Sequence, residues 1–202
     1  TDNIKMERKY LSEDKIFDLI NNIKSPKHRI IALIQTLTGV RAGDIMNIKR
    51  GNIFIEDYNK KAVLRLNITG KGGKRNVIYV HDEVAGKLIL DYISKCNTGN
   101  DYYFLENTKY KRKLKDNQYL FYRMNYLWYH ADLKTAMEST GIDRKDFATH
   151  DFRRCFARRV WERYKDIHVL QSILNHADPK TSLRYLNQSG LKNIDYHREM
   201  QS

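Results

Sequence analysis

Apolar residues recur every three or four positions in the N-terminal part of the chain, a spacing that predicts two amphipathic helices. The first begins after Ser12, an N-cap residue that is followed by acidic residues. The second begins near Pro26 and ends at Gly39, and its apolar residues fall on one face. We expect this second helix to deliver Arg41 to a buried turn, and a short third helix to follow at about 42–48.

The apolar spacing shortens to every second position after the third helix, which predicts β-strands. The β-rich segments begin near Ile53, Val63 and Val77, and polar turns separate them. This order predicts a three-stranded antiparallel meander. Its second turn, Gly70-Lys71-Gly72-Gly73, is rich in glycine.

The rest of the chain reads mostly as helix, apart from a polar, basic stretch at 106–118 that we expect to be an exposed loop. We therefore expect an α+β domain that is mostly helical, with a small three-stranded antiparallel sheet at one edge. A helix is expected over 82–95, with the apolar set Val84, Leu88, Ile89, Tyr92 and Ile93. Further helices are expected at 119–139, 150–164, 166–176 and 179–187.

Large apolar and aromatic side chains are concentrated in the helix expected at 119–139. Such side chains either pack in a core or serve as platforms on which nucleic-acid bases stack. Burial is the commoner arrangement, so we expect core packing. The residues concerned are Leu120, Tyr122, Tyr126, Trp128 and Tyr129.

Charge narrows the class of partner. The chain of 202 residues has 37 Lys and Arg against 24 Asp and Glu, which gives a formal net charge of +13. A balance this basic is typical of proteins that neutralise phosphate groups, so a polyanion is the expected partner. Ribosomal and membrane-surface proteins can be equally basic, so charge alone does not define the function.

Cysteine usage and hydropathy indicate the compartment. Cys96 and Cys155 are too few for a disulfide framework, which fits a reducing cytosol. No apolar run approaches the roughly 18 residues of a membrane span, and residues 1–9 lack a signal-peptide core. We expect a cytoplasmic protein with no membrane partner. Because the chain opens on Thr1 and enters structured sequence at once, we also expect that an N-terminal neighbour domain is missing from it.

Short motifs along the chain contain groups that can handle a phosphodiester. Arginine binds phosphate as a permanent bidentate cation, lysine and histidine transfer protons, and a tyrosine hydroxyl attacks phosphorus once its anion is stabilised. Taken singly, each such residue is more often a surface, ion-pair or core residue. In chain order the motifs are Thr38-Gly39-Val40-Arg41, Gly70-Lys71-Gly72-Gly73-Lys74, His150-Asp151-Phe152-Arg153, Leu174-Asn175-His176, and Tyr185 nine residues after His176.

The order and spacing of these motifs resemble the catalytic domain of tyrosine site-specific recombinases, the family of phage integrases and chromosome-dimer resolvases. The resemblance covers residues 10–186. It implies a catalytic domain over 1–186, a C-terminal tail over 187–202 that is exchanged between protomers, and an N-terminal DNA-binding domain outside this chain. It also implies a homotetramer on two double-stranded DNA duplexes. Leu191 and Ile194 are candidate anchors of the tail, and a frayed terminus is the other interpretation.

The resemblance implies a recombinase or integrase that cleaves and rejoins DNA through a 3′-phosphotyrosyl intermediate, with no cofactor and no metal. In that family the residue matching Tyr185 is the nucleophile, and those matching Arg41 and Arg153 clamp the phosphate. The residue matching His150 handles protons and contacts the phosphate. The residue matching His176 donates a hydrogen bond to a non-bridging oxygen.

The resemblance assigns Lys71 as the general acid that protonates the leaving 5′ oxygen, and Lys74 is the alternative. Asp44 either orients a neighbouring side chain or is an ordinary surface acid. Basic residues that we expect to contact DNA are Lys74, Arg75, Lys111, Arg112 and Lys113. The chain departs from the family pattern at Asp44 (usually Glu), Phe152 (often Leu), Arg154 (often His) and Asn175 (usually Gly), and none of these changes removes a catalytic functional group.

Other functions fit part of the pattern. A type IB topoisomerase uses nearly the same groups, but usually places a longer stretch before its tyrosine. A DNA-binding protein on the same fold would not need the complete set of six residues. A zinc site made of His150, His168 and His176 lacks a Cys or a close carboxylate at ligand spacing.

Overall fold

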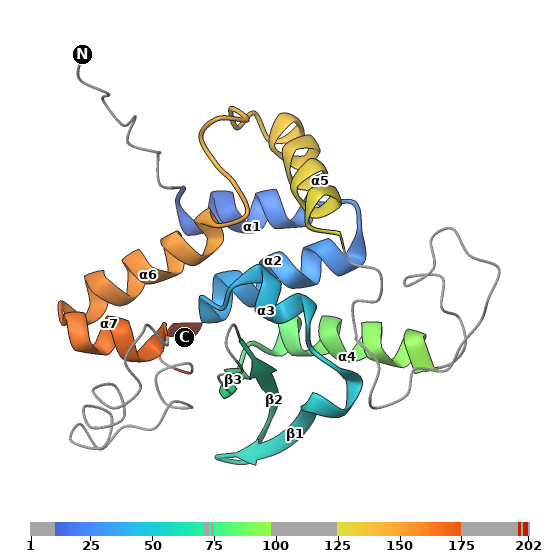
Figure 1. The fold of residues 1–202 in the computed structure, drawn as a ribbon, viewed down its shortest axis with the longest axis vertical. Coiled ribbons are helices and arrows are strands. Elements are labelled where there is room, and N and C mark those ends of the chain that lie inside the picture. The colour runs from blue at the N-terminus through green and yellow to red at the C-terminus, as the bar shows by residue number, and fades with distance from the viewer. Residues whose placement is uncertain are drawn as a thin grey trace.

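The computed structural model describes residues 11–70, 73, 75–97, 125–174, 198, 200 and 201. These residues form a mostly helical domain with one three-stranded sheet (Figure 1). This arrangement confirms the predicted α+β fold. The elements are α1 (Glu13–Asn21), α2 (Pro26–Thr38), α3 (Ala42–Met46), the 3-10 helix η1 (Arg50–Asn52), β1 (Ile53–Tyr58), β2 (Lys61–Thr69), β3 (Arg75–Val80), α4 (Glu83–Asn97), α5 (Tyr126–Ser139), α6 (Asp151–Tyr164) and α7 (Ile167–Ile173).

Helix α2 lies at the centre of the domain and packs against α1, α3, α4, α6 and β3 (Figure 1). Residues 30–40 are all buried, so the apolar residues expected on one face are in the core, and the polar residues among them are buried as well. The two threonines of α2 tolerate burial because they bond within the helix: Thr36 Oγ1 donates to the carbonyl of Ala32 at 2.8 Å and Thr38 Oγ1 to that of Ile34 at 2.6 Å. Because α2 is packed on all sides, its C-terminal end at Gly39 is held in a fixed position relative to its neighbours.

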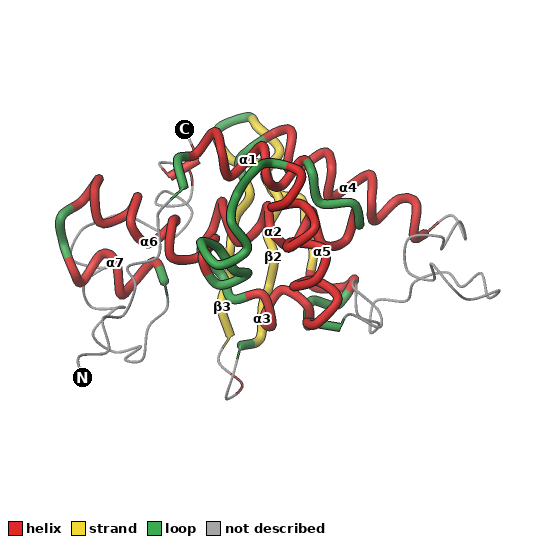
Figure 2. The backbone as a smooth tube through the Cα atoms, turned by 90° about the horizontal axis from the view of Figure 1, so that it is seen from above, coloured by secondary structure: helices red, strands yellow, loops and turns green. Residues whose placement is uncertain are grey.

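The strands form the predicted antiparallel meander in the order β1-β2-β3. Tyr58 pairs with Lys61 across the first turn. The two residues between them, Asn59 and Lys60, have φ values of 51° and 64°, as a type I′ hairpin requires. Strand β2 also packs against α3 at the end that leads into the second turn (Figure 2). The buried face of β2 and β3 carries Leu64, Leu66, Ile68, Ile78 and Val80.

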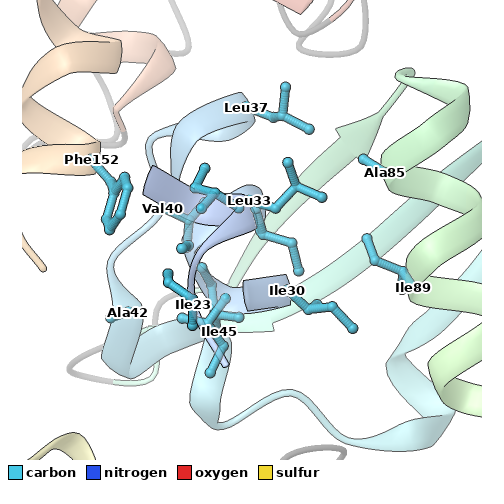
Figure 3. Close-up of a cluster of buried hydrophobic side chains, with 14 of the residues drawn as sticks. Ile23, Ile30, Leu33, Leu37, Val40, Ala42, Ile45, Ala85, Ile89 and Phe152 are labelled. Carbon is cyan, nitrogen blue, oxygen red and sulfur yellow. The ribbon is translucent and has the colours of Figure 1, made fainter. Parts of the chain in front are cut away.

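Two clusters of apolar side chains form the core. The larger surrounds α2, where Leu33 and Leu37 point towards the sheet and α4, which contributes Ala85 and Ile89 (Figure 3). Each large side chain buried in this way stabilises the fold by about 1.5–3 kcal/mol. The smaller cluster joins α6 to α7 through Phe156, Val160, Val169, Ile173 and Leu174.

The sequence prediction for α5 is wrong in two details, its first residue and the burial of two aromatic side chains. Helix α5 begins at Tyr126 rather than at 119, because Asn125 has an extended backbone and its side chain accepts the N–H of Leu127 at 2.8 Å. Tyr126 and Trp128 are 37% and 58% exposed, so core packing holds for Tyr129 and not for these two. Leu120 and Tyr122 lie outside the described residues.

The buried side of α4 also differs from the prediction. Ile89, Tyr92 and Ile93 are buried as expected, but Val84 and Leu88 are exposed and Ala85 is buried. Ala85 contributes little to a hydrophobic pattern because its side chain is small. Its place in the core is decided by the close approach of α4 to α2.

Candidate active site

Gly39 ends α2 in the left-handed conformation, with φ at 69°, and its N–H donates to the carbonyl of Gln35 at 2.8 Å. A Cβ at this position would lie 2.8 Å from Leu174 Cδ2 and closer still to the ring of Phe156. Backbone conformation and space therefore both require glycine. The tight turn brings Arg41, the N-cap of α3, next to the start of α6.

Arg153 lies on α6 and connects it to the C-terminal ends of α2 and α7. Its two terminal nitrogens donate to main-chain carbonyls, one to that of Gly39 and the other, at 2.9 Å, to that of Leu174. Its side chain is partly buried, whereas that of Arg41 is exposed. The prediction that Arg41 enters a buried turn is therefore correct for Gly39 and Val40 and wrong for the arginine side chain.

The charges of this site act on one another. Burial, followed by the positive charge of Arg41, lowers the pKa of Arg153 to about 10, while the carboxylate of Asp44 acts in the opposite direction. The guanidinium of Arg153 is still protonated at neutral pH. Two cations held so close repel each other, and an anion placed between them relieves that repulsion.

A pocket of about 40 Å³ lies beside the two arginines, between the end of α2, α3, β2 and the end of α7. Asp44 lies on its wall, and an added Cβ on Gly70 would be 3.3 Å from Asp44 Oδ2. The carboxylate therefore lies against the base of the β2–β3 turn, and its charge also acts on Arg153. The pocket is lined by Thr38, Val40, Arg41, Asp44, Ile68, Gly70, Asn76, Arg153, Ile173 and Leu174.

His150 immediately precedes α6, and its side chain is exposed. It does not line the pocket. Its ring lies against Tyr126, with the ring centroids 6.1 Å apart. The turn that leads to it is closed by Asp151, whose carboxylate accepts the N–H of Ala148 at 2.7 Å and an arginine hydrogen bond from Arg154 at 2.9 Å.

The structure thus brings together Arg41, Asp44 and Arg153, and holds His150 one helical turn before Arg153. Arg75, an expected DNA contact, is exposed at the start of β3 opposite Thr69. The other expected site residues lie outside the described part of the chain. They are Lys71, Lys74, Lys111, Arg112, Lys113, His176 and Tyr185.

A buried polar network behind the site was not expected from the sequence. Gln35 Nε2 donates to the carbonyl of Thr149 at 3.3 Å, and Tyr129 donates its hydroxyl to Gln35 Oε1 at 2.9 Å. All three residues are buried. A signal for it was present, since Gln35 is a carboxamide that directly follows the apolar run 30–34 of the second helix.

No group of three His, Cys, Asp or Glu side chains among the described residues could hold a metal ion. His176, one member of the rejected zinc set, is not described. Cys155 is a buried free thiol whose pKa is raised by burial. In the same part of the chain no helix is long and apolar enough to cross a membrane.

The chain belongs to the phage integrase family, whose sequence profile matches residues 9–190. It is 27% identical over 210 residues to the tyrosine recombinase XerD of Rickettsia prowazekii, a match that covers 98% of this chain and 62% of that protein. It is 30% identical over 180 residues to XerA of Pyrococcus furiosus, covering 88% of this chain and 56% of the relative. The chain therefore spans a little over half the length of these relatives.

Solved structures share the fold. The XerH site-specific recombinase bound to palindromic difH substrate matches with a TM-score of 0.62 and 17% identity, over 90% of this chain and 50% of that one. The lambda integrase catalytic core matches with a TM-score of 0.53 and 17% identity, over 84% of this chain and 96% of that one. The described domain thus has the fold of tyrosine recombinase catalytic domains.

Proposed function

We propose that this protein is a site-specific DNA recombinase or integrase that cleaves and rejoins double-stranded DNA through a 3′-phosphotyrosyl intermediate. The observation that carries the proposal is the meeting of Arg41 and Arg153 at one small pocket. Membership of the phage integrase family, together with relatives that are tyrosine recombinases, supports it. The net charge of +13 suits a DNA partner.

In the proposed reaction the phenolic oxygen of Tyr185 gives up its proton to His150 and attacks the phosphorus. A bond from phosphorus to the tyrosine oxygen forms while the bond to the 5′ oxygen breaks, and Lys71 donates a proton to that leaving oxygen. Arg41 and Arg153 bind the non-bridging oxygens, on which charge develops. Rejoining reverses the steps, with a 5′ hydroxyl as the attacking group, so the chemistry requires neither a metal ion nor a nucleotide cofactor.

The two histidines complete this proposal. His150 stands at the N-terminal end of the helix that carries Arg153, one turn away from the guanidinium. We assign it to phosphate contact and proton handling, and His176 to a hydrogen bond with a non-bridging oxygen. Asp44 contacts the base of the turn that contains Lys71 and lies close to Arg153, so it orients both sides of the pocket.

A type IB topoisomerase is the less favoured function. The relatives matched by this chain are named recombinases and integrases. Tyr185 also follows His176 by only nine positions, a shorter spacing than topoisomerases usually have. A DNA-binding protein without cleavage activity would need the two arginines for phosphate binding, but it would not need the complete set of six residues that includes Lys71 and Tyr185.

We further propose that the whole protein acts as a tetramer on two duplexes in the cytoplasm, and that residues 187–202 are exchanged between protomers. One observation supports a specific binding site for this tail, at the end of α2 and the residues that join β3 to α4. The carboxamide of Gln201 accepts the N–H groups of His81 and Asp82, at 2.9 and 3.3 Å, and donates to the carbonyls of Leu37 and Tyr79, at 3.2 and 3.1 Å. A cavity of about 790 Å³ lies beside this binding site, between the β1–β2 turn and α4.

The function is tested by incubating the protein with nicked DNA half-sites and looking for a covalent protein–DNA adduct. The wild-type protein should form the adduct equally well with and without EDTA. Tyr185→Phe should bind the same DNA and form none, because affinity comes mainly from phosphate neutralisation. An adduct formed by Tyr185→Phe, or cleavage that needs a divalent cation, would overturn the proposal.

A further inference from the structure

Thr149 precedes His150 in the chain and is held at both of its polar groups. Its main-chain carbonyl accepts a hydrogen bond from Gln35 Nε2 at 3.3 Å, and its hydroxyl bonds to the hydroxyl of Tyr126. The residue is 1% exposed, so water does not compete for these bonds. Because the peptide bond is planar, holding the carbonyl of Thr149 also holds the plane that contains the N–H and Cα of His150.

Gln35 is itself held in place. Its Oε1 accepts the hydroxyl hydrogen of Tyr129 at 2.9 Å, and both residues are completely buried. Burial raises the pKa of Tyr129 well above its ordinary value, so the phenol stays protonated and remains a donor. The main-chain carbonyl of Gln35 also accepts the N–H of Gly39 at 2.8 Å. One residue thus connects the turn that carries Arg41 to the turn that carries His150.

Tyr126 contacts both Thr149 and His150. Its ring lies 6.1 Å from the imidazole of His150, at an interplanar angle of 42°, and meets Tyr129 edge-on at 6.4 Å. Unlike Tyr129, which is fully buried, Tyr126 is 37% exposed and is the first residue of α5. Its hydroxyl holds Thr149 while its ring flanks the imidazole. Both the backbone and the ring plane of His150 are therefore restrained by the same side chain.

We propose that Tyr126 is a positioning residue that sets the orientation of the His150 imidazole, with Gln35 and Tyr129 as its buried anchor. The inference rests on the proposed strand-cleavage reaction, in which His150 contacts the phosphate. A small error in the placement of such a group costs rate, and a displacement of about 1 Å can cost roughly a hundredfold. The network acts through His150, so its effect on rate should vanish when the imidazole is absent.

The test is the single-turnover rate of adduct formation on a nicked half-site, with DNA affinity measured in parallel. Tyr126→Ala should slow the reaction roughly 10- to 100-fold while leaving the Kd for DNA unchanged. Tyr126→Phe keeps the ring and loses the bond to Thr149, so its rate should fall between those of the wild type and Tyr126→Ala. Leu127→Ala is the matched control, because Leu127 lies in the same turn of α5 and is 72% exposed. It should react like the wild type.

A double-mutant cycle separates positioning from general stability. In a His150→Ala background, Tyr126→Ala should slow the reaction less than about threefold, and an undiminished loss in that background would overturn the proposal. A second readout needs no cleavage: the NMR signal of the His150 ring proton should shift in Tyr126→Ala and stay in place in Leu127→Ala. An unchanged signal in Tyr126→Ala would also overturn the inference. If the wild-type protein forms no adduct while Tyr126→Ala still shows this shift, the proposed reaction is refuted and the contact between Tyr126 and His150 is established.

Discussion

Arg153 donates a hydrogen bond to the main-chain carbonyl of Gly39, although the two residues are 114 positions apart in the chain. The contact joins the end of the central helix to the helix that carries the second arginine. A second bond from the same guanidinium, to the carbonyl of Leu174 at 2.9 Å, extends the connection to α7. Arg153 is therefore part of the scaffold as well as of the candidate site, and substitutions near it should separate these two roles.

Gly39→Ala should destabilise the protein by about 2–4 kcal/mol, because a methyl group there adds overpacking against Phe156 and Leu174 to the strain of a left-handed backbone. Gly141→Ala is the control. Gly141 has the same φ of 69°, but an added Cβ there meets nothing within 4 Å. Backbone strain alone should lower the free energy of unfolding of Gly141→Ala, by about 1–2 kcal/mol. Urea unfolding measures both, and equal losses would contradict the packing argument.

Arg41→Ala and Arg153→Ala should affect stability differently. Arg153 is partly buried and bonded to two carbonyls, so its loss should lower the free energy of unfolding by about 1–3 kcal/mol. Arg41 is exposed, so its removal should leave that free energy nearly unchanged. Both variants should lose roughly 10²–10³ in the rate of adduct formation. The comparison needs urea unfolding and single-turnover cleavage of the same preparations, and a full cleavage rate in either variant would exclude that arginine from the phosphate clamp.

Asp132 should stabilise the protein in a pH-dependent way. Burial raises the pKa of Asp132, but a hydrogen bond with His28 Nδ1 at 2.9 Å and another from the N–H of Ser25 at 3.0 Å outweigh it, so the pKa is lowered overall. A lowered folded-state pKa gives stability that is present above the ordinary carboxyl pKa of about 3.9 and is lost as the pH falls through the folded value.

Asp132→Asn should therefore be less stable than the wild type at neutral pH, and the gap should narrow as the pH falls below about 4. Urea unfolding from pH 7 to 3 measures this difference. Asp91→Asn, at an exposed position in the middle of α4, serves as the control and should follow the wild type throughout. A gap that widens in acid would contradict the assignment.

Lys71 and Lys74 can be distinguished as the general acid by the leaving group. A substrate with sulfur in place of the bridging 5′ oxygen has a leaving group that departs without a proton. Lys71→Ala should lose roughly 10²–10⁴ in rate on ordinary DNA and recover on the sulfur substrate. Arg41→Ala should not recover, because it loses charge stabilisation rather than a proton. Rescue of Lys74→Ala in place of Lys71→Ala would reverse the assignment.

The sequence by itself determined the local elements. Ser12, Pro26 and Gly39 mark helix ends, and the structure places α1 and α2 within these limits. The change of apolar spacing predicted the meander, and the turn at Asn59 and Lys60 joins β1 to β2 where the polar residues indicated. Such features depend on residues a few positions apart, so a pattern along the chain is enough to predict them. The motif order was also sufficient to indicate the family.

Only the tertiary structure decided which side chains meet. The central position of α2 buries Gln35 and turns it toward Thr149, whereas periodicity alone predicted a helix with one apolar face. The exposure of Tyr126 and Trp128 and the burial of Ala85 depend on how α5 and α4 pack against their neighbours. The bond between Arg153 and the carbonyl of Gly39 is likewise invisible in the sequence, because a main-chain acceptor carries no residue type and is identified only when distant segments pack together.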